Sequence, residues 1–205
     1  MINILNLGIG NFNSVNNWVK QSGKPTKLIS DPMSYKSGLI IIPGVCSSAT
    51  LIDRINSKNF NQLIGDVIGS GEIVLGICAG YQILGRHTEE GGGRECLGYL
   101  PFDVMRVKDN KNSDSGCTGW KEVCIKLESE NELVKRFQRN NFLRGDAYFN
   151  HEFGALVETD AITTTDMYDK QEKYCSYFVR DNIIGFQFHP EKSSNFGLKL
   201  LGMFV

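Results

Sequence analysis

One cysteine, Cys78, stands between two glycines directly after a short apolar run at residues 73–77. The pattern predicts a strand, a sharp turn and then a helix, the arrangement in which a nucleophile stands on a strained turn. Gly76 and Gly80 would remove the Cβ atoms that collide in such a turn. The N–H groups at the start of the helix favour thiolate over thiol, which would make Cys78 reactive. A buried, inert core cysteine explains this motif alone equally well.

A general base for the cysteine must come from three histidines. His189 precedes a proline just after an apolar strand, and proline keeps the preceding residue extended. In an extended segment, positions i and i+2 face the same side, so Glu191 can orient the imidazole of His189. Cys78, His189 and Glu191 therefore form a candidate triad, although a strand-end histidine beside a surface glutamate is the alternative. His151 either lines the pocket or is a hydrogen-bonded loop residue, and we expect His87 at the surface.

Composition and charge favour small-molecule chemistry. The 205 residues are 41% hydrophobic and 22% charged, which suits one large domain or two small ones. We find no linker, so we expect a single domain over residues 1–205. The net charge of -1 and the lack of long charged runs argue against nucleic acid or an anionic membrane as partner.

The first residues and the cysteines predict a cytoplasmic protein without metal or cofactor. The apolar start carries no positive charge and is interrupted by Gly8, so we expect no signal peptide. No stretch approaches the roughly 20 apolar residues that span a bilayer. Six cysteines without C-x-x-C spacing indicate free thiols. Gly8 and Gly10 begin a dinucleotide-binding pattern, but its third glycine would fall at Asn13, so we reject a nucleotide cofactor.

The elements that must position these residues alternate between strands and helices. We expect strands at 3–7, 27–29, 39–42 and 73–77, and helices at 12–21, 60–68 and 79–86. The alternation predicts an α/β fold, a three-layer, doubly wound, mostly parallel sheet of flavodoxin-like type. Shorter strands at 103–107, 121–127 and 147–149 indicate a smaller antiparallel region. Strands at 173–179 and 183–188 and a helix at 194–205 close the chain.

The two motifs together resemble the class I glutamine amidotransferases, whose triad is Cys-His-Glu. The resemblance rests on Gly76–Gln82 and Gln187–Ser193. Residues 43–45, Pro-Gly-Val, match the oxyanion strand of that family. The length and the segments 8–11, 118–120 and 148–151 are similar to one branch of it, the glutaminase subunits of imidazole glycerol phosphate synthase.

The resemblance implies hydrolysis of L-glutamine to L-glutamate and ammonia through a thioester. Cys78 would attack the side-chain amide, with His189 as acid and base and Glu191 orienting its ring. The resemblance also assigns two further groups of residues. These are an oxyanion hole of Gly44, Val45 and Ala79, and glutamine contacts from Gln82, Glu90 and His151.

The resemblance further implies a partner protein. Ammonia would pass to a synthase (cyclase) subunit of the (βα)8-barrel type in a heterodimer of histidine biosynthesis. Gly10, Asn11, Trp120 and Lys192 match positions at that interface, where we expect an exposed apolar patch.

Several departures from the family pattern lie outside the triad, among them Gly116–Thr118 before Gly-Trp and Phe153. Three more are Cys46 after the oxyanion strand, Lys121 after Gly-Trp, and Glu152 after His151. They leave open a paralogue that supplies ammonia to another acceptor, such as amidino-sugar formation in surface polysaccharide biosynthesis. A non-catalytic scaffold subunit and a thiol peptidase or γ-glutamyl hydrolase are the more distant alternatives.

Overall fold

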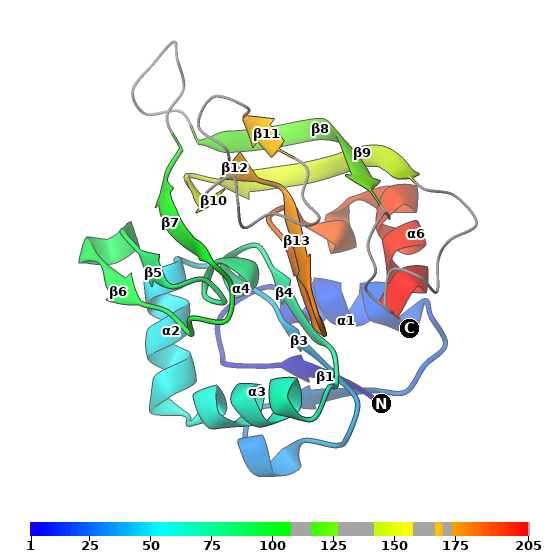
Figure 1. The fold of residues 1–205 in the computed structure, drawn as a ribbon. Coiled ribbons are helices and arrows are strands. Elements are labelled where there is room, and N and C mark those ends of the chain that lie inside the picture. Colours follow the sequence, from blue (N-terminus) through cyan, green and yellow to red (C-terminus); the bar gives the residue numbers. More distant parts are fainter. Residues whose placement is uncertain (108–115, 127–141, 158–166, 170–173, 205) are drawn as a thin grey trace.

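Six strands form the central sheet of the computed structural model, which describes residues 1–107, 116–126, 142–157, 167–169 and 174–204 (Figure 1). Their order across the sheet is β13-β14-β4-β3-β1-β2. All neighbours pair in parallel except β13 and β14. The six strands are β1 (Ile2–Leu5), β2 (Thr26–Ile29), β3 (Leu39–Ile42), β4 (Val74–Ile77), β13 (Tyr177–Arg180) and β14 (Ile183–Phe186).

The central strands are buried on both faces, as their continuous apolar runs predict. Within β3, Leu39 and Ile41 belong to one hydrophobic cluster, whereas Ile40 and Ile42 belong to the other. This alternation follows from the two-residue period of a strand. The sheet therefore separates two cores.

Helices cover both faces of this sheet (Figure 1). On one face lie α1 (Phe12–Lys20) and α6 (Ser194–Phe204), joined by the Trp18 indole N–H, which donates to the Gly197 carbonyl at 2.9 Å. On the other face lie α2 (Ser48–Ser57) and α3 (Phe60–Gly69). The predicted three-layer, doubly wound architecture is confirmed.

The remaining strands form a second sheet and a separate ribbon. The second sheet has the order β11-β12-β10-β7-β5-β6 and is mostly antiparallel. It comprises β5 (His87–Thr88), β6 (Arg94–Glu95), β7 (Phe102–Arg106), β10 (Phe153–Val157), β11 (Met167–Asp169) and β12 (Tyr174–Cys175). The ribbon pairs β8 (Cys117–Lys126) with β9 (Phe142–His151). The expected antiparallel region is therefore present, and β8 and β9 are longer than the strands predicted there. The single strand expected at 173–179 is wrong, because the chain forms two strands, β12 in the second sheet and β13 in the central sheet. Residues 127 and 173, each at one end of an expected strand, lie outside the described residues.

Two helices differ from the sequence-based expectation. The helix α2 was not predicted, although Ser47 caps it by accepting a hydrogen bond from the Thr50 N–H and its apolar residues have helical spacing. The helix after Cys78 was expected to reach residue 86, but α4 spans only Ala79–Gln82. The backbone groups beyond α4 bond to another segment instead: the Ile83 carbonyl accepts from the Leu97 N–H, and the Arg86 N–H donates to the Phe102 carbonyl, each at 2.8 Å. The chain then joins the second sheet.

Short 3-10 helices occupy three of the connections. They are η1 (Pro32–Ser34), η2 (Glu90–Gly92) and η4 (Pro190–Lys192). None of the helices in the described part of the chain combines the length and apolar character that crossing a membrane requires.

Candidate active site

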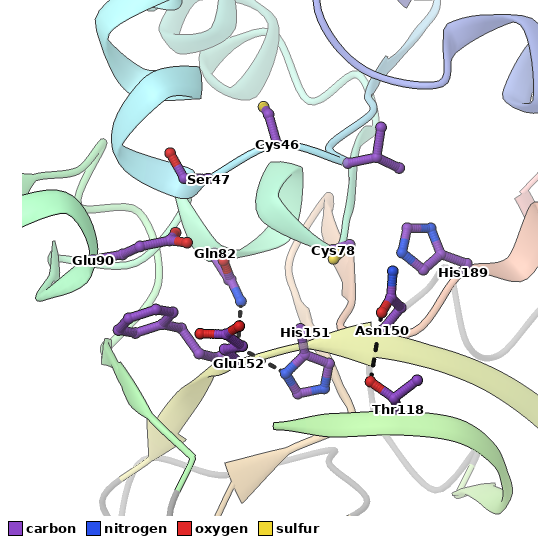
Figure 2. Close-up of a pocket in the computed structure, with 12 residues that line it drawn as sticks. Cys46, Ser47, Cys78, Gln82, Glu90, Thr118, Asn150, His151, Glu152 and His189 are labelled. Carbon is purple, nitrogen blue, oxygen red and sulfur yellow. Dashed lines mark hydrogen bonds between the residues drawn. The ribbon is translucent and has the colours of Figure 1, made fainter. Parts of the chain in front are cut away.

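A cavity of 360 Å³ opens beyond the carboxyl ends of three adjacent strands, β3, β4 and β14. This edge of a parallel sheet is where ligands bind in open α/β folds. Figure 2 shows the side chains around the cavity. They belong to Val45, Cys46, Ser47, Cys78, Gln82, Glu90, Thr118, Asn150, His151, Glu152, Phe153 and His189.

Cys78 occupies a strained turn between β4 and α4. Its backbone φ is 53° and ψ is -112°, a region that L-residues rarely adopt. A Cβ on Gly76 would lie 2.5 Å from the Gly80 carbonyl oxygen, and one on Gly80 would lie 1.9 Å from the Ile42 carbonyl oxygen. The predicted need for both glycines is confirmed, and the turn presents the thiol to the cavity.

The extension of β14 brings His189 to the same edge. The Cys78 N–H donates to the Phe186 carbonyl at 2.7 Å, which aligns the ends of β4 and β14. The His189 N–H donates to the Tyr148 carbonyl at 2.8 Å, so β9 fixes its backbone from the other side. The imidazole is 1% exposed, and it faces Cys78 across the cavity (Figure 2).

A carboxylate holds the ring of His189 from behind. The Nδ1–H donates to Glu191 Oε1 at 2.8 Å, and the Glu191 side chain is also 1% exposed. The predicted pairing of these two residues is confirmed. Since Nδ1 is bound to Glu191, Nε2 is the ring nitrogen available to the thiol of Cys78.

These contacts favour a charged imidazole. Burial alone would lower the pKa of His189, but hydrogen bonds with Cys78 and Glu191 and the charges of both raise this pKa to about 9. The thiol of Cys78, the imidazole of His189 and the carboxylate of Glu191 thus lie side by side in space. This is the arrangement found in hydrolases that form an acyl-enzyme.

The loop after β3 packs directly on the start of α4. A Cβ on Gly44 would lie 2.4 Å from the Gly80 nitrogen and 2.6 Å from the Ala79 Cβ, so only glycine fits at this position. The first N–H groups of a helix have no acceptor within it. The residues predicted for an oxyanion hole, Gly44, Val45 and Ala79, are therefore brought beside Cys78.

Two of the predicted glutamine contacts, Gln82 and Glu90, line the cavity on the other side of Cys78 from His189 (Figure 2). The buried Gln82 amide donates to the Phe153 carbonyl at 2.6 Å and to Gln187 Oε1 at 3.2 Å. Glu90 Oε2 accepts from the Ser48 N–H at 2.6 Å and from its hydroxyl at 2.7 Å. The Glu90 carboxylate is therefore held at the N-terminus of α2, where Ser48 is the first residue.

The third predicted contact, His151, also lines the cavity. Its Nδ1–H donates to the Phe153 carbonyl at 2.8 Å. Burial lowers the pKa of His151 to about 4, so this imidazole is neutral near pH 7. His87 is half-buried on β5 and is not one of the lining residues in the described part of the chain.

Comparison with known proteins agrees with this geometry. The sequence model of the family "Glutamine amidotransferase class-I" matches residues 13–204.

The chain belongs to this family.

Several relatives of the class I amidotransferase extend over its full length. The protein named "Imidazole glycerol phosphate synthase subunit HisH" of Archaeoglobus fulgidus is 34% identical, covering 100% of this chain and 98% of its own. The proteins of the same name from Pyrococcus furiosus and Bacillus subtilis are 34% and 30% identical, covering 97% and 95% of their own lengths.

Solved structures show the same fold. The structure of PurLQS from Thermotoga maritima has a TM-score of 0.70 at 17% identity and covers 99% of this chain and 96% of its own. A crystal structure of a glutamine amidotransferase has a TM-score of 0.63 at 17% identity and covers 98% of each chain.

Gln187 is a site residue that the sequence did not lead us to predict. Gln187 is fully buried, and its amide donates to the Cys78 sulfur at 3.9 Å. It lies two positions before His189, on the same side of an extended segment, and this spacing was the available signal. Ser48, which fixes Glu90, was missed because α2 was missed.

Two of the predicted interface residues gather around Tyr148. The Trp120 side chain is 55% exposed, and its ring centroid lies 5.7 Å from that of Tyr148. The Lys192 ammonium lies 5.4 Å from the centroid of the same ring. Gly10 and Asn11 lie instead at the start of α1, where the Asn11 side chain accepts from the Ser14 N–H and caps the helix. That helix contacts η4, so both groups border the His189 segment.

Some of the departures from the family pattern, Cys46 and Glu152 among them, line the cavity itself. Burial raises the pKa of the Cys46 thiol to about 11, so this second cysteine stays protonated near pH 7. Glu152 pairs with Arg106, with Nη1 to Oε2 at 3.1 Å. None of the departures replaces a residue of the triad.

Proposed function

We propose that this chain is the glutaminase subunit of imidazole glycerol phosphate synthase and hydrolyses L-glutamine to L-glutamate and ammonia. The whole chain, residues 1–205, would act as one domain in the cytoplasm. Family membership and full-length relatives of that name support the proposal. The single observation that carries it is the strained Cys78 facing an imidazole that Glu191 holds.

In the first half-reaction, the sulfur of Cys78 attacks the side-chain amide carbon of glutamine. His189, which is charged near pH 7, already holds on Nε2 the proton that Cys78 gives up, and it passes this proton to the leaving ammonia. Glu191 stabilises the imidazolium and fixes its orientation. The backbone N–H groups of Ala79 and of Gly44 or Val45 hold the oxyanion, and removing one such donor typically costs about 3 kcal/mol of barrier.

In the second half-reaction, His189 activates a water molecule that attacks the thioester. Glutamate leaves and the thiol of Cys78 is restored, so the net change is glutamine plus water to glutamate plus ammonia. The Glu90 carboxylate pairs with the substrate ammonium, and Gln82 and His151 line the channel for its side chain. The neutral state of His151 avoids repulsion of that ammonium.

Ammonia passes to a synthase subunit of the (βα)8-barrel type in this proposal. The exposed Trp120, with Lys192 and Tyr148, forms one side of the docking surface, and Gly10 and Asn11 form another. Tryptophan and tyrosine are enriched among the residues that carry most of the binding energy of protein interfaces.

Glutamine hydrolysis in the presence of a cyclase subunit tests the chemistry. Cys78→Ala should lower the rate about 10⁴-fold or more, since the acyl-enzyme cannot form. Cys96→Ala, a half-buried thiol outside the cavity, is the matched control and should retain the rate. Unchanged activity in Cys78→Ala would exclude the mechanism and leave the scaffold hypothesis. Partner-independent turnover of peptides would favour a peptidase or γ-glutamyl hydrolase.

The acceptor is tested separately, because Lys121 and Glu152 depart from the family pattern and favour a second candidate, a paralogue serving another acceptor. A strain that lacks only the histidine glutaminase subunit should regain growth without histidine when it expresses this chain. Failure of growth despite glutaminase activity of the purified chain would favour the paralogue.

A further inference from the structure

The end of the cavity away from Cys78 carries two carboxylates. Glu90 and Glu152 lie on the side of Gln82, whereas Cys78 and His189 lie on the other (Figure 2). Among the described residues that line the cavity there is no lysine or arginine. A substrate whose amide reaches Cys78 must place its charged end between these carboxylates.

These two carboxylates suit the ammonium group of an amino acid but not its α-carboxylate. The ammonium group of glutamine is attracted to Glu90 and Glu152, but the α-carboxylate is repelled by both. The nearby histidines do not offset this repulsion, because His151 is neutral and His189 is paired with Glu191. A cation just beyond the lining residues would offset this repulsion, and two are close: Lys121, whose charge acts on His151, and Arg106, which pairs with Glu152.

Of these two cations, Arg106 is the one that pairs with a carboxylate at this end of the cavity. Its guanidinium lies 3.1 Å from Glu152 and 4.7 Å from the centroid of the Phe153 ring, and both of these residues line the cavity. The pairing of β7 with β10 sets Arg106 opposite Phe153. Its backbone is held at both polar groups, since its N–H donates to Glu89 and its carbonyl accepts from the Tyr174 hydroxyl at 2.6 Å.

The Arg106 side chain has freedom that its backbone lacks. The side chains of Arg106 and Glu152 are 43% and 65% exposed, and exposed pairs of this kind are weak. A guanidinium has five donors in a planar fork, so it can bind two carboxylates at once. Little interaction is lost if it turns from Glu152 alone toward a second carboxylate.

We propose that Arg106 binds the α-carboxylate of the substrate and that Glu152 is the positioning residue that holds Arg106 at the rim of the cavity. The inference rests on the proposed glutaminase function and adds the determinant of amino-acid specificity. It also gives a role to Glu152, a residue at which this chain departs from the family pattern.

The test compares three amides: L-glutamine, 4-aminobutanamide, which lacks the carboxylate, and glutaramate, which lacks the ammonium. Their dissociation constants are measured by calorimetry on Cys78→Ala and on Cys78→Ala/Arg106→Gln, each bound to the cyclase subunit. Arg106→Gln should weaken L-glutamine and glutaramate about tenfold, the loss of one charge-assisted contact. Binding of 4-aminobutanamide should not change. Equal weakening of all three amides, or of none, would overturn the proposal.

Steady-state kinetics separate a positioning role from a structural one. With Cys78 intact, Arg106→Gln should raise KM for L-glutamine while kcat changes little, and Arg106→Lys should restore part of the loss. Glu152→Gln should raise KM in the wild-type background but have no further effect in Arg106→Gln, because Glu152 acts through Arg106. Independent, additive effects of the two substitutions would contradict this.

Arg86→Gln is the matched control. It removes a similar pair, Arg86 with Asp103 at 3.0 Å, whose side chains are 48% and 40% exposed and do not line the cavity. Its KM should equal that of the unmodified chain. If the unmodified chain itself shows no glutamine turnover, the proposed function fails; if it turns over and Arg106→Gln equals Arg86→Gln, only the present inference fails.

Discussion

Cys78 keeps a backbone conformation that side chains rarely adopt. Residues held in such regions cost of order 1–3 kcal/mol each, and they persist where the surroundings determine them. Here the surroundings are Gly76 and Gly80, which leave space for the turn, and the bond from the Cys78 N–H to β14. The strain aims the sulfur at the cavity.

Relief of this strain should be measurable as stability. The free energy of unfolding of Cys78→Gly should exceed that of Cys78→Ala by about 1 kcal/mol, measured by chemical denaturation. This difference is the strain that glycine relieves, less the cost of ordering the more flexible unfolded glycine. Both variants should lack glutaminase activity. A Cys78→Gly variant that is less stable than Cys78→Ala would show that the turn is not strained.

The charge of His189 depends on its two neighbours. NMR titration of the ring should give a pKa near 9, and Glu191→Gln should lower this pKa because it removes the carboxylate charge. Cys78→Ala should lower it as well. A His189 pKa that is the same in all three proteins would mean that the ring does not interact with these groups.

At the level of secondary-structure elements, the parallel pairing of β3, β4 and β14 places the site residues together. The ends of β3, β4 and β14 are neighbours, so segments that are far apart in sequence deliver the oxyanion loop, the nucleophile and the base to one edge. The close contact between β3 and α4 at Gly80 sets the distance between the first two.

Gly80→Ala tests that contact. The added methyl would lie 1.9 Å from the Ile42 carbonyl, so strand and helix must separate, and we expect a loss of stability of about 3 kcal/mol. Gly69→Ala is the control, since a Cβ at this helical position meets nothing within 4 Å and should be neutral or slightly stabilising. Chemical denaturation measures both. Equal stabilities would contradict the packing.

How far sequence predicts the elements depends on whether their signal is local. The strands of the central sheet were predictable because burial on both faces requires unbroken apolar runs, as in β3 and β4. The early end of α4 was not, because it depends on Phe102 from a distant strand. The pairing of Arg106 with Glu152 likewise follows from β7 lying beside β10, and no local pattern indicates it.

The candidate site followed the same division. The relation of His189 to Glu191 is local, two positions apart in an extended segment, and the sequence was sufficient. The support of Glu90 by Ser48 joins two separate segments, 42 positions apart, and required the fold.

At the scale of the whole molecule, two buried histidines give the stability of the fold opposite dependences on pH. The pKa of His189 is raised from about 6.5 to about 9, so its contribution is complete below pH 6.5 and is lost as the pH rises through 9. The pKa of His151 is lowered to about 4, so the unfolded chain binds more protons between pH 6.5 and 4, and stability falls as the pH decreases through that range.

Substitution separates the two histidines. His151→Asn should flatten the loss of stability between pH 6.5 and 4, and His189→Asn should flatten the loss between pH 6.5 and 9, each relative to the unmodified protein. Urea denaturation across the pH range measures both slopes. A His151→Asn protein with an unchanged acid slope would show that this imidazole is not buried in its neutral form.

The central claim is that the sulfur of Cys78 becomes acylated by glutamine. The cavity holds a second thiol, Cys46, so the chain supplies its own comparison. The complex with the cyclase subunit is mixed with L-glutamine, quenched in acid during turnover, digested and examined by mass spectrometry. We predict one glutamyl group on the peptide that contains Cys78 and none on the peptide that contains Cys46. A glutamyl group on Cys46, or undiminished turnover in Cys78→Ala, would contradict the account.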